Sequence, residues 1–343
     1  MVTLKQIAAS LDLSVMAVSK ALRDAPDIGA ATKERVRQEA KRVGYVPNHL
    51  ARSLRGGATQ LLGVLFPALN DPFGSNVLSG MEQEASARDY QLLVASSQNS
   101  MAMEMAALYK MLERKVEAIF VLPLVRLQHR SPLVDVTSHH GVPLIFLHQY
   151  PADVAQYSKT GWVVNDAQKG CETITKHLLD TGHQKILYFS GPANASSSAE
   201  HMSGFRKALI AGGLSMNDES VFLAGFDVEG GKLAMMRALA EKVPFTAVVC
   251  VNDAVAVGAI EILRKHSYQV PEDISVVGYG DGLMAAHCQV PLTTIRQSQV
   301  DLGKAAFNLW HQWKRGEEQL RGKVLPVELI VRRSSGPVAT QRS

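Results

Sequence analysis

From residue 60 to residue 280 the sequence alternates short apolar runs with stretches long enough to form a helix. A first set of apolar runs ends near residue 147, and a second set follows a polar link at 149–161. Repeated strand–helix–strand units predict parallel sheets covered by helices on both faces. Because the pattern occurs twice, we expect two doubly wound α/β subdomains. The expected strands are 61–66, 91–95, 118–122 and 144–147, then 162–164, 186–190, 221–224, 247–251 and 274–278.

The composition favours a soluble globular protein of more than one domain. The 343 residues exceed the ~100–200 residues of an ordinary domain. No apolar run approaches the ~18 residues that a membrane span requires, and the first residues do not have the layout of a secretion signal. We therefore expect a cytoplasmic protein. The cysteines Cys171, Cys250 and Cys288 are far apart without a C-x-x-C motif, which favours reduced thiols.

The charge of the chain is unevenly distributed. Residues 1–58 contain ten Lys or Arg and five Asp or Glu, a surplus of five, whereas the formal net charge of the whole chain is +4. Residues 59–343 therefore carry a net charge of −1. A basic segment on a nearly neutral body is typical of a polyanion-binding head. Taken alone, the asymmetry fits a solvated basic helical surface equally well.

Two short helices are predicted at the N-terminus. Thr3 and Gln6 have the spacing of a capping box, and Ser14 is a suitable N-cap for a second helix over 15–22. About four residues join the two helices, which predicts a helix-turn-helix whose second helix reads bases in the major groove. Its outward positions are Val15, Met16, Ser19 and Lys20. A third amphipathic helix is predicted over 30–43.

Residues 47–58 predict a short hinge helix that Pro47 opens and Gly56-Gly57 closes. A flexible linker is the alternative. However, apolar and basic side chains alternate along this segment, and an apolar side chain beside arginines suits a minor-groove wedge. The inserted side chain unstacks a base step while the cations hold the phosphates. The side chains in question are Leu50, Arg52, Leu54 and Arg55.

Three stretches keep a distinctive order and spacing here, namely T-L-K-Q-I-A, L-S-V-M-A-V-S-K-A-L and V-G-Y-V-P-N-H-L-A-R-S-L. With them, residues 2–58 resemble the DNA-binding head and hinge helix of the lactose-repressor (LacI/GalR) family of bacterial transcription regulators. The resemblance implies that Val15, Met16 and Lys20 read bases, that Leu54 intercalates, and that the hinge lies along the minor groove. The DNA-binding residues expected are Thr3, Ser14, Val15, Met16, Ser19, Lys20, Asn48, Ala51, Arg52, Leu54 and Arg55.

The head departs from the family pattern at two positions. Ala17 stands where the family usually has Thr, and Lys20 stands where it usually has Arg. Lys lacks the rigid bidentate fork with which Arg contacts guanine. We therefore expect a half-site that differs from the commoner ones.

The body lacks the motifs of common α/β enzymes. The first expected strand leads into Pro67 and Ala68 rather than G-x-G-x-x-G, and the glycine-rich run 278–282 fits a strand-to-loop turn. Neither a G-x-S-x-G elbow nor a P-loop occurs. The histidines do not have the i, i+4 spacing of helical metal ligands. We expect no enzyme, no catalytic residues, no metal and no cofactor.

Five further stretches carry a resemblance across the body: N-D-P-F at 70–73, H-L-L-D-T-G-H-Q-K-I at 177–186, V-N-D at 251–253, V-P-E-D-I-S-V-V-G-Y at 270–279 and P-L-T-T-I-R-Q at 291–297. They are similar to the effector domain of the same family and, through it, to periplasmic sugar-binding proteins. The resemblance implies a periplasmic-binding-protein-like body below an all-α helix-turn-helix head. In such sheets a small ligand binds beyond the carboxyl ends of the strands, between the two halves.

The expected effector pocket differs from the family at three positions. His201 stands where the family has an Arg before a Gly-aromatic pair, Gly280 replaces an Asp with Asp281 next to it, and His148 replaces another Asp. These changes remove charged groups that read vicinal hydroxyls. An ordinary imidazole pKa at His201 would make effector affinity vary between about pH 5.5 and 7.5. The effector-binding residues expected are Asp71, Phe73, His148, Ser197, His201, Phe226, Asn252, Asp281 and Gln297.

The expected function is that of a sequence-specific DNA-binding repressor, a homodimer on a near-palindromic operator, controlled by a sugar or sugar-like effector. A corepressor-dependent regulator and a ligand-binding module with a silent head are alternatives, and an α/β enzyme ranks lower. The expected domains are a helix-turn-helix over 1–46, a hinge helix over 47–58, an effector domain over 59–335 and a disordered tail over 336–343. Within the effector domain, 59–161 plus 292–322 would form one subdomain and 162–291 plus 323–335 the other. Because no long C-terminal heptad segment occurs, we expect a dimer rather than a tetramer.

Overall fold

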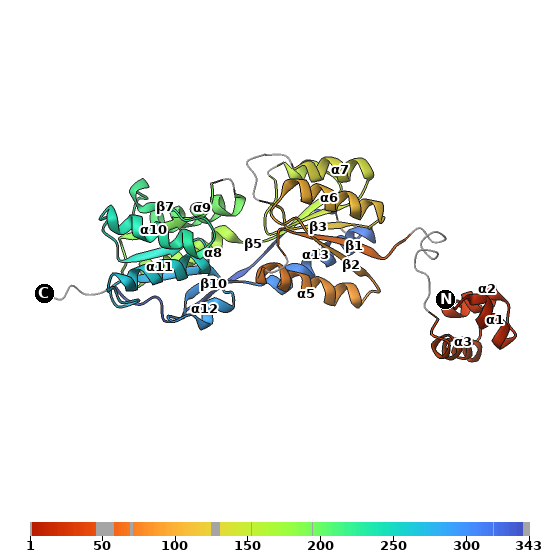
Figure 1. Ribbon diagram of the computed structural model, residues 1–343. Helices are drawn as coiled ribbons and strands as arrows, with labels where there is room; N and C mark the ends of the chain where they lie inside the picture. The colour runs from red at the N-terminus through yellow and green to blue at the C-terminus, as the bar shows by residue number, and fades with distance from the viewer. Residues whose placement is uncertain are drawn as a thin grey trace. The chain divides into compact units, whose positions relative to one another are not determined.

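The computed structural model describes residues 2–45, 58–68, 71–124, 131–151, 153–193, 195–317 and 319–338. The chain divides into a head, residues 1–59, and a body from Gln60 onward (Figure 1). Each unit has its own core. The predicted hinge positions Asn48, Ala51, Arg52, Leu54 and Arg55 lie outside the described residues.

The head consists of α1 (Leu4–Leu11), α2 (Val15–Leu22) and α3 (Ala30–Arg42) around a small apolar core. The Thr3 N–H donates to Gln6 Oε1 at 2.8 Å, and Ser14 Oγ accepts from the Ala17 N–H at 3.0 Å. These side chains satisfy backbone donors that the first helical turn leaves without partners. The capping residues predicted from the sequence therefore start both helices. The fully buried core side chains are Ile7, Val18, Ala21 and Val36.

The first sheet of the body has the strand order β11-β5-β4-β3-β1-β2, and every pairing in it is parallel. Helices α5 and α13 cover one face and helices α6 and α7 cover the other (Figure 1). The strands are β1 (Leu61–Phe66), β2 (Gln91–Ser96), β3 (Ile119–Val121), β4 (Leu144–Leu147), β5 (Thr160–Asn165) and β11 (Gly322–Leu325). The helices are α5 (Pro72–Ser86), α6 (Met101–Glu113), α7 (Pro132–His140) and α13 (Gln299–Lys314).

The second sheet has the order β12-β10-β9-β8-β6-β7, with β12 antiparallel to β10 and the other strands parallel. Helices α8 and α9 pack on one face and helices α10 and α11 on the other. The strands are β6 (Ile186–Ser190), β7 (Val221–Leu223), β8 (Ala247–Cys250), β9 (Ser275–Gly280), β10 (Thr293–Gln297) and β12 (Val327–Ile330). The helices are α8 (Ala167–Asp180), α9 (Ser196–Ala211), α10 (Val228–Ala240), α11 (Asp253–Lys265) and α12 (Leu283–His287). The predicted fold class is confirmed.

The boundary between the two halves was predicted wrongly. Strand β5, expected to begin the second half, pairs with β4 and extends the first sheet. Strand β10, expected in the first half, pairs with β9 in the second sheet. The chain thus passes between the sheets after β5, after β10 and after β11. A strand's apolar pattern does not specify which sheet edge it joins, because that choice depends on long-range pairing.

The predicted disordered tail is also partly wrong. Residues 336–338 are ordered: the Gly336 N–H donates to Ser275 Oγ at 3.1 Å, and the Val338 N–H donates to the Thr181 carbonyl at 3.0 Å. Backbone hydrogen bonds hold this segment against the second sheet and the end of α8. Polar composition indicated disorder because it does not reveal such backbone partners.

Helices α5 and α13 pack with their backbones in close contact. A Cβ at Gly80 would lie 2.0 Å from the Val300 carbonyl oxygen, and one at Gly303 would lie 2.0 Å from the Val77 carbonyl oxygen. Only glycine fits at either place. This contact fixes α13 rigidly across the first sheet. None of the helices within the described ranges is long and apolar enough to cross a membrane.

Candidate functional site

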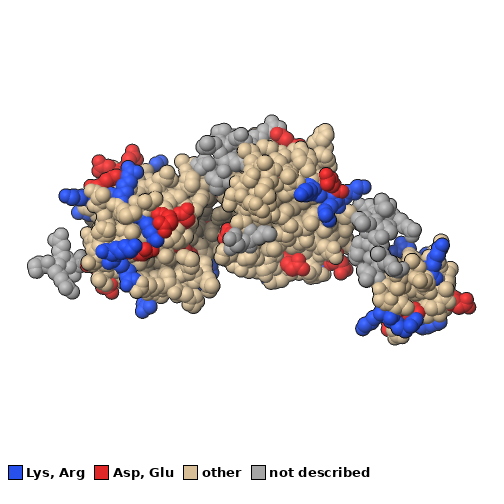
Figure 2. Space-filling model, viewed as in Figure 1, with Lys and Arg blue, Asp and Glu red and all other residues tan. Residues whose placement is uncertain are grey.

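The outward face of α2 exposes the side chains that were predicted to read bases. Met16 is 69% exposed and Val15 is 40% exposed, whereas Val18 on the opposite face is fully buried. Lys and Arg side chains are prominent on the visible face of the head (Figure 2). An exposed helix face of this kind, next to a firmly packed core, is what insertion into the major groove requires.

Several basic side chains of the head are paired with carboxylates. Lys20 forms an ion pair with Asp27, and Asp24 contacts Arg37 at 2.8 Å and Lys33 at 3.3 Å. The Lys20 ammonium holds the pKa of Asp27 below its ordinary value, chiefly through their hydrogen bond. Contact of Lys20 with a base therefore requires exchange of the Asp27 partner.

The body contains a cavity of about 1490 Å³ that residues from both sheets line. All nine residues predicted to bind effector lie in its wall: Asp71, Phe73, His148, Ser197, His201, Phe226, Asn252, Asp281 and Gln297. Most of these follow the carboxyl ends of strands, which places the cavity where ligands bind in doubly wound sheets. Their presence in one wall makes a common binding role geometrically possible.

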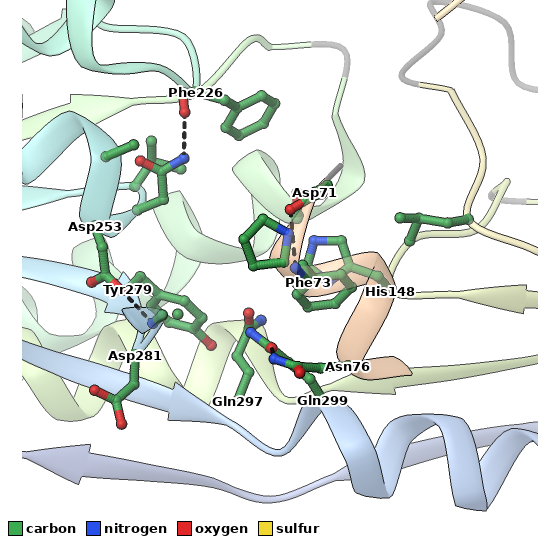
Figure 3. A pocket seen from close by; sticks show the side chains of 18 of the residues that line it. Asp71, Phe73, Asn76, His148, Phe226, Asp253, Tyr279, Asp281, Gln297 and Gln299 are labelled. Atoms are coloured by element: carbon green, nitrogen blue, oxygen red, sulfur yellow. Dashed lines mark hydrogen bonds between the residues drawn. The ribbon is translucent and has the colours of Figure 1, made fainter. Parts of the chain in front are cut away.

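The two histidines of the wall come from different halves of the body. His148 follows β4, adopts a φ of 67°, and packs against Phe73 with ring centroids 4.6 Å apart (Figure 3). His201, on α9, packs against Tyr279 at 4.2 Å and is 5% exposed. Burial lowers the pKa of His148 to about 4 and that of His201 to about 3, with the neighbouring His148 as a second cause for His201. Both rings are therefore neutral at pH 7.

Asp281 is engaged by two arginines. Its Oδ2 accepts from Arg296 Nε at 2.7 Å, and its Oδ1 accepts from Arg332 Nη2 at 2.6 Å. In Figure 3 its carboxylate is turned away from Phe73 and His148. These ion pairs occupy one acceptor site on each oxygen and fix the loop after β9.

Asn252 and Asp253 organise the loops at the cavity. Asn252 Oδ1 accepts from the Val255 N–H at 2.8 Å and caps α11, while its Nδ2 donates to the Phe226 carbonyl at 2.7 Å. Asp253 accepts from Thr294 Oγ1 at 2.6 Å and from the Gly282 N–H at 3.0 Å. Burial raises the pKa of the Asp253 carboxyl. Asn252 thus has a structural role beside its predicted one.

The structure adds wall residues that sequence reasoning did not select. Asn76 Nδ2 donates to Gln299 Oε1 at 2.8 Å and so ties α5 to the start of α13. Asp253, Tyr279 and Arg296 lie within stretches that carried the family resemblance, so the sequence held a signal for them. The remaining residues gave none. The added polar wall residues include Asn76, Asn99, Asp253, Tyr279, Arg296, Gln299 and Arg332.

A helix-turn-helix head on a body with a ligand-sized cavity between two sheets defines a class: a DNA-binding regulator with a small-molecule sensor. Comparison with known proteins supports this class. Residues 3–48 match "Bacterial regulatory proteins, lacI family", and residues 175–335 match "Periplasmic binding protein-like domain".

Individual relatives align over nearly the whole chain. The chain is 28% identical to "HTH-type transcriptional repressor PurR" of Photobacterium profundum, over 97% of this chain and 98% of that protein. It is 27% identical to "Ribose operon repressor" of Haemophilus influenzae, with the same two coverages. Among solved structures, "transcriptional regulator CelR-cellobiose complex" has a TM-score of 0.74 at 27% identity, covering 97% of this chain and 100% of that one.

The chain has a DNA-binding head of the lacI family of bacterial regulatory proteins and a periplasmic-binding-protein-like body. Its function is that of a DNA-binding transcriptional repressor controlled by a small-molecule effector.

Proposed function

We propose that a sugar or sugar-like metabolite binds in the cavity and controls the affinity of the head for its operator. The observation that carries this proposal is the cavity lined by residues of both sheets. A ligand that contacts both halves has a different affinity for their open and closed arrangements. A 100-fold difference would shift that equilibrium by ~2.7 kcal/mol. Relatives named for ribose and for cellobiose support the sugar class.

We propose that the DNA-binding form is a homodimer on a near-palindromic operator. One small helix-turn-helix covers only a half-site, so two heads are needed for a complete site. In this proposal Val15, Met16 and Lys20 contact base edges and the hinge over 47–58 enters the minor groove. Thr3, Ser14 and Ser19 would contact the DNA backbone beside them.

Two alternatives differ in what the effector does. As an inducer, the effector would favour the arrangement that releases DNA; as a corepressor, it would favour the DNA-binding arrangement. A ligand-binding module with a silent head is a third possibility. We propose that the chain is not an enzyme: its curated relatives are transcriptional repressors, and the described parts of the chain contain no group of His, Cys, Asp or Glu suited to a metal ion.

The test has two stages. A thermal-shift screen of sugars, sugar acids and nucleosides would identify stabilising compounds, since a ligand that binds the folded state raises Tm. Genomic fragments selected by the full-length protein would supply an operator for mobility-shift assays with and without each hit. Loss of the shifted band would indicate an inducer, and its strengthening a corepressor. A protein that binds hits but selects no fragment would refute the repressor assignment.

A further inference from the structure

The arrangement of charged groups in the cavity wall disfavours an anionic ligand. The described wall residues include three carboxylates, of Asp71, Asp253 and Asp281, and two guanidinium groups, of Arg296 and Arg332. Both arginines contact Asp281, and Arg296 also approaches Glu328 at 3.3 Å. A phosphate or carboxylate ligand would thus have to compete for cations that are already paired, beside carboxylates that repel it.

Among the described wall residues, His201 has buried polar atoms without a hydrogen-bond partner. The ring is 5% exposed, lines the cavity, and neither Nδ1 nor Nε2 has a hydrogen-bond partner among the residues that the structure places. A neutral imidazole has one donor and one acceptor nitrogen, and leaving both unsatisfied in a buried site costs free energy. A ligand with an acceptor and a donor at suitable positions would satisfy the ring without bringing a charge.

Aromatic rings form the other part of the wall. The Phe73 and His148 rings pack together at an interplanar angle of 54° on the first half of the body. Phe226, after β7 in the second half, is 37% exposed. In Figure 3 Phe226 lies at the top of the view, apart from Phe73, which lies beside His148 near the centre. Apolar faces from both halves suit a ligand with a flat or ring-shaped apolar surface.

We propose that the effector is an uncharged ring compound whose apolar face packs against Phe73 and Phe226 and whose polar edge hydrogen-bonds the neutral imidazole of His201. This inference rests on the proposed function, because it concerns the ligand of the same cavity. It narrows the class to nucleosides, free bases, and glycosides with a substantial apolar face. Phosphorylated and carboxylated derivatives of the same compounds would bind weakly.

The experiment uses the full-length protein and matched pairs of ligands. The protein is equilibrated with an aqueous bacterial metabolite extract, and retained compounds are identified by mass spectrometry. Each retained compound and its charged or uncharged counterpart are then titrated by calorimetry, as with inosine and inosine 5′-monophosphate or cellobiose and cellobionic acid. We expect the uncharged member to bind at least tenfold more tightly. Anionic compounds that bind as tightly as their uncharged counterparts, or more tightly, would overturn the inference.

Substitution of His201 tests the contact itself. His201→Arg should move the preference toward the anionic member by at least tenfold, because it introduces a cation without a carboxylate partner. His201→Gln keeps a donor and an acceptor without charge and should retain the preference for the uncharged member. His139→Arg, at an exposed position on α7, is the matched control. A preference unchanged by His201→Arg would rule out His201 as the contact.

Operator binding by the same preparations separates the two proposals. Intact DNA binding together with anionic ligands in the cavity would overturn the inference about charge and leave the regulator assignment in place. Selective binding of uncharged ligands without any operator complex would refute the DNA-binding role alone. Circular dichroism and the operator complex also verify that each variant is folded.

Discussion

At the residue scale, the Lys20–Asp27 ion pair bears directly on how the head reads DNA. Lys20 was selected as a base-reading side chain from its outward place on α2. The structure shows that its ammonium already has a carboxylate partner in Asp27, and both side chains are substantially exposed. Exposed pairs of this kind contribute little to stability, about 0–1 kcal/mol. Asp27 therefore competes with DNA for the Lys20 ammonium only weakly, but the effect should be measurable.

Asp27→Asn should raise the affinity of the protein for DNA by about two- to fivefold, because it removes the competing partner of Lys20. Fluorescence anisotropy with a labelled duplex at fixed salt measures the change. Asp12→Asn removes an equal charge from an exposed residue with a φ of 54°, a conformation that Asn tolerates, and serves as the control. Equal affinity of the two variants would show that the ion pair itself is unimportant.

The buried histidines make the stability of the body sensitive to acid. Their pKa values, about 4 for His148 and about 3 for His201, lie below the ordinary value of 6.5. As the pH falls, these two imidazoles therefore bind protons in the unfolded chain before they do so in the folded protein. The free energy of unfolding is therefore highest above pH 6.5, where both rings are neutral in either state. It decreases as the pH falls from 6.5 toward the pKa values of the folded protein. The low pKa values also correct the expectation of pH-dependent effector affinity between pH 5.5 and 7.5.

Between pH 7 and pH 5, the free energy of unfolding of the His201→Gln variant should fall less than that of the unmodified protein. The difference between the two decreases should be up to about 2 kcal/mol. Urea denaturation at both pH values measures this difference. His139→Gln, which removes an exposed imidazole, should retain the full acid sensitivity. In addition, effector affinity should be constant from pH 5.5 to 7.5 unless the effector itself titrates. Identical pH profiles for His201→Gln and the unmodified protein would contradict the assigned burial effect.

At the element scale, α13 connects the cavity with the start of the body. Its 16 residues begin at Gln299, which lines the cavity and bonds Asn76, and end at Lys314. Lys314 contacts Glu117, and Glu117 Oε1 accepts from the backbone N–H of Gln60 at 2.7 Å. A helix of this length spans about 24 Å. One rigid element therefore joins the effector wall to the point where the body begins.

Glu117→Ala should lower the free energy of unfolding by about 1–3 kcal/mol, because it leaves the Gln60 N–H and the Lys314 ammonium without this carboxylate. Urea denaturation measures the loss. Glu113→Ala, at an exposed position near the end of α6, should change stability by less than about 0.5 kcal/mol. Similar values for both variants would show that the Glu117 contacts are energetically unimportant.

At the scale of the whole molecule, the C-terminal segment holds the second half of the body together. The Thr293 N–H donates to Ser334 Oγ at 2.9 Å, and His183 Nε2 lies 3.0 Å from the Gly336 carbonyl oxygen. His183 Nδ1 also lies 2.9 Å from Thr246 Oγ1. The segment thus links strands and loops that are distant in sequence.

Truncation after Arg333 should lower Tm by roughly 5–15 °C, because several hydrogen bonds to buried groups are lost together. Differential scanning calorimetry measures this change. Truncation after Val338 keeps all of the contacts named above and should leave Tm within about 1–2 °C of the intact protein. An unchanged Tm after truncation at Arg333 would show that the C-terminal segment is dispensable for stability.

The sequence alone determined the local elements and the class of protein. Apolar periodicity placed eight of the nine expected strands in the sheets predicted for them, and Thr3, Gln6 and Ser14 start the first helices as expected. These features depend on residues close together in the chain. The nine predicted effector residues also proved to lie in one cavity wall.

Only the tertiary structure decided where β5 and β10 pair and what surrounds the cavity side chains. The Asp281 carboxylate meets Arg296 from β10 and Arg332 from beyond β12, and His201 meets Tyr279 from the end of β9. Such neighbours are set by sheet order and by the three passages between the sheets. Residue type specifies which hydrogen bonds and charges a side chain offers, whereas long-range packing determines which of them are satisfied and which remain for a ligand.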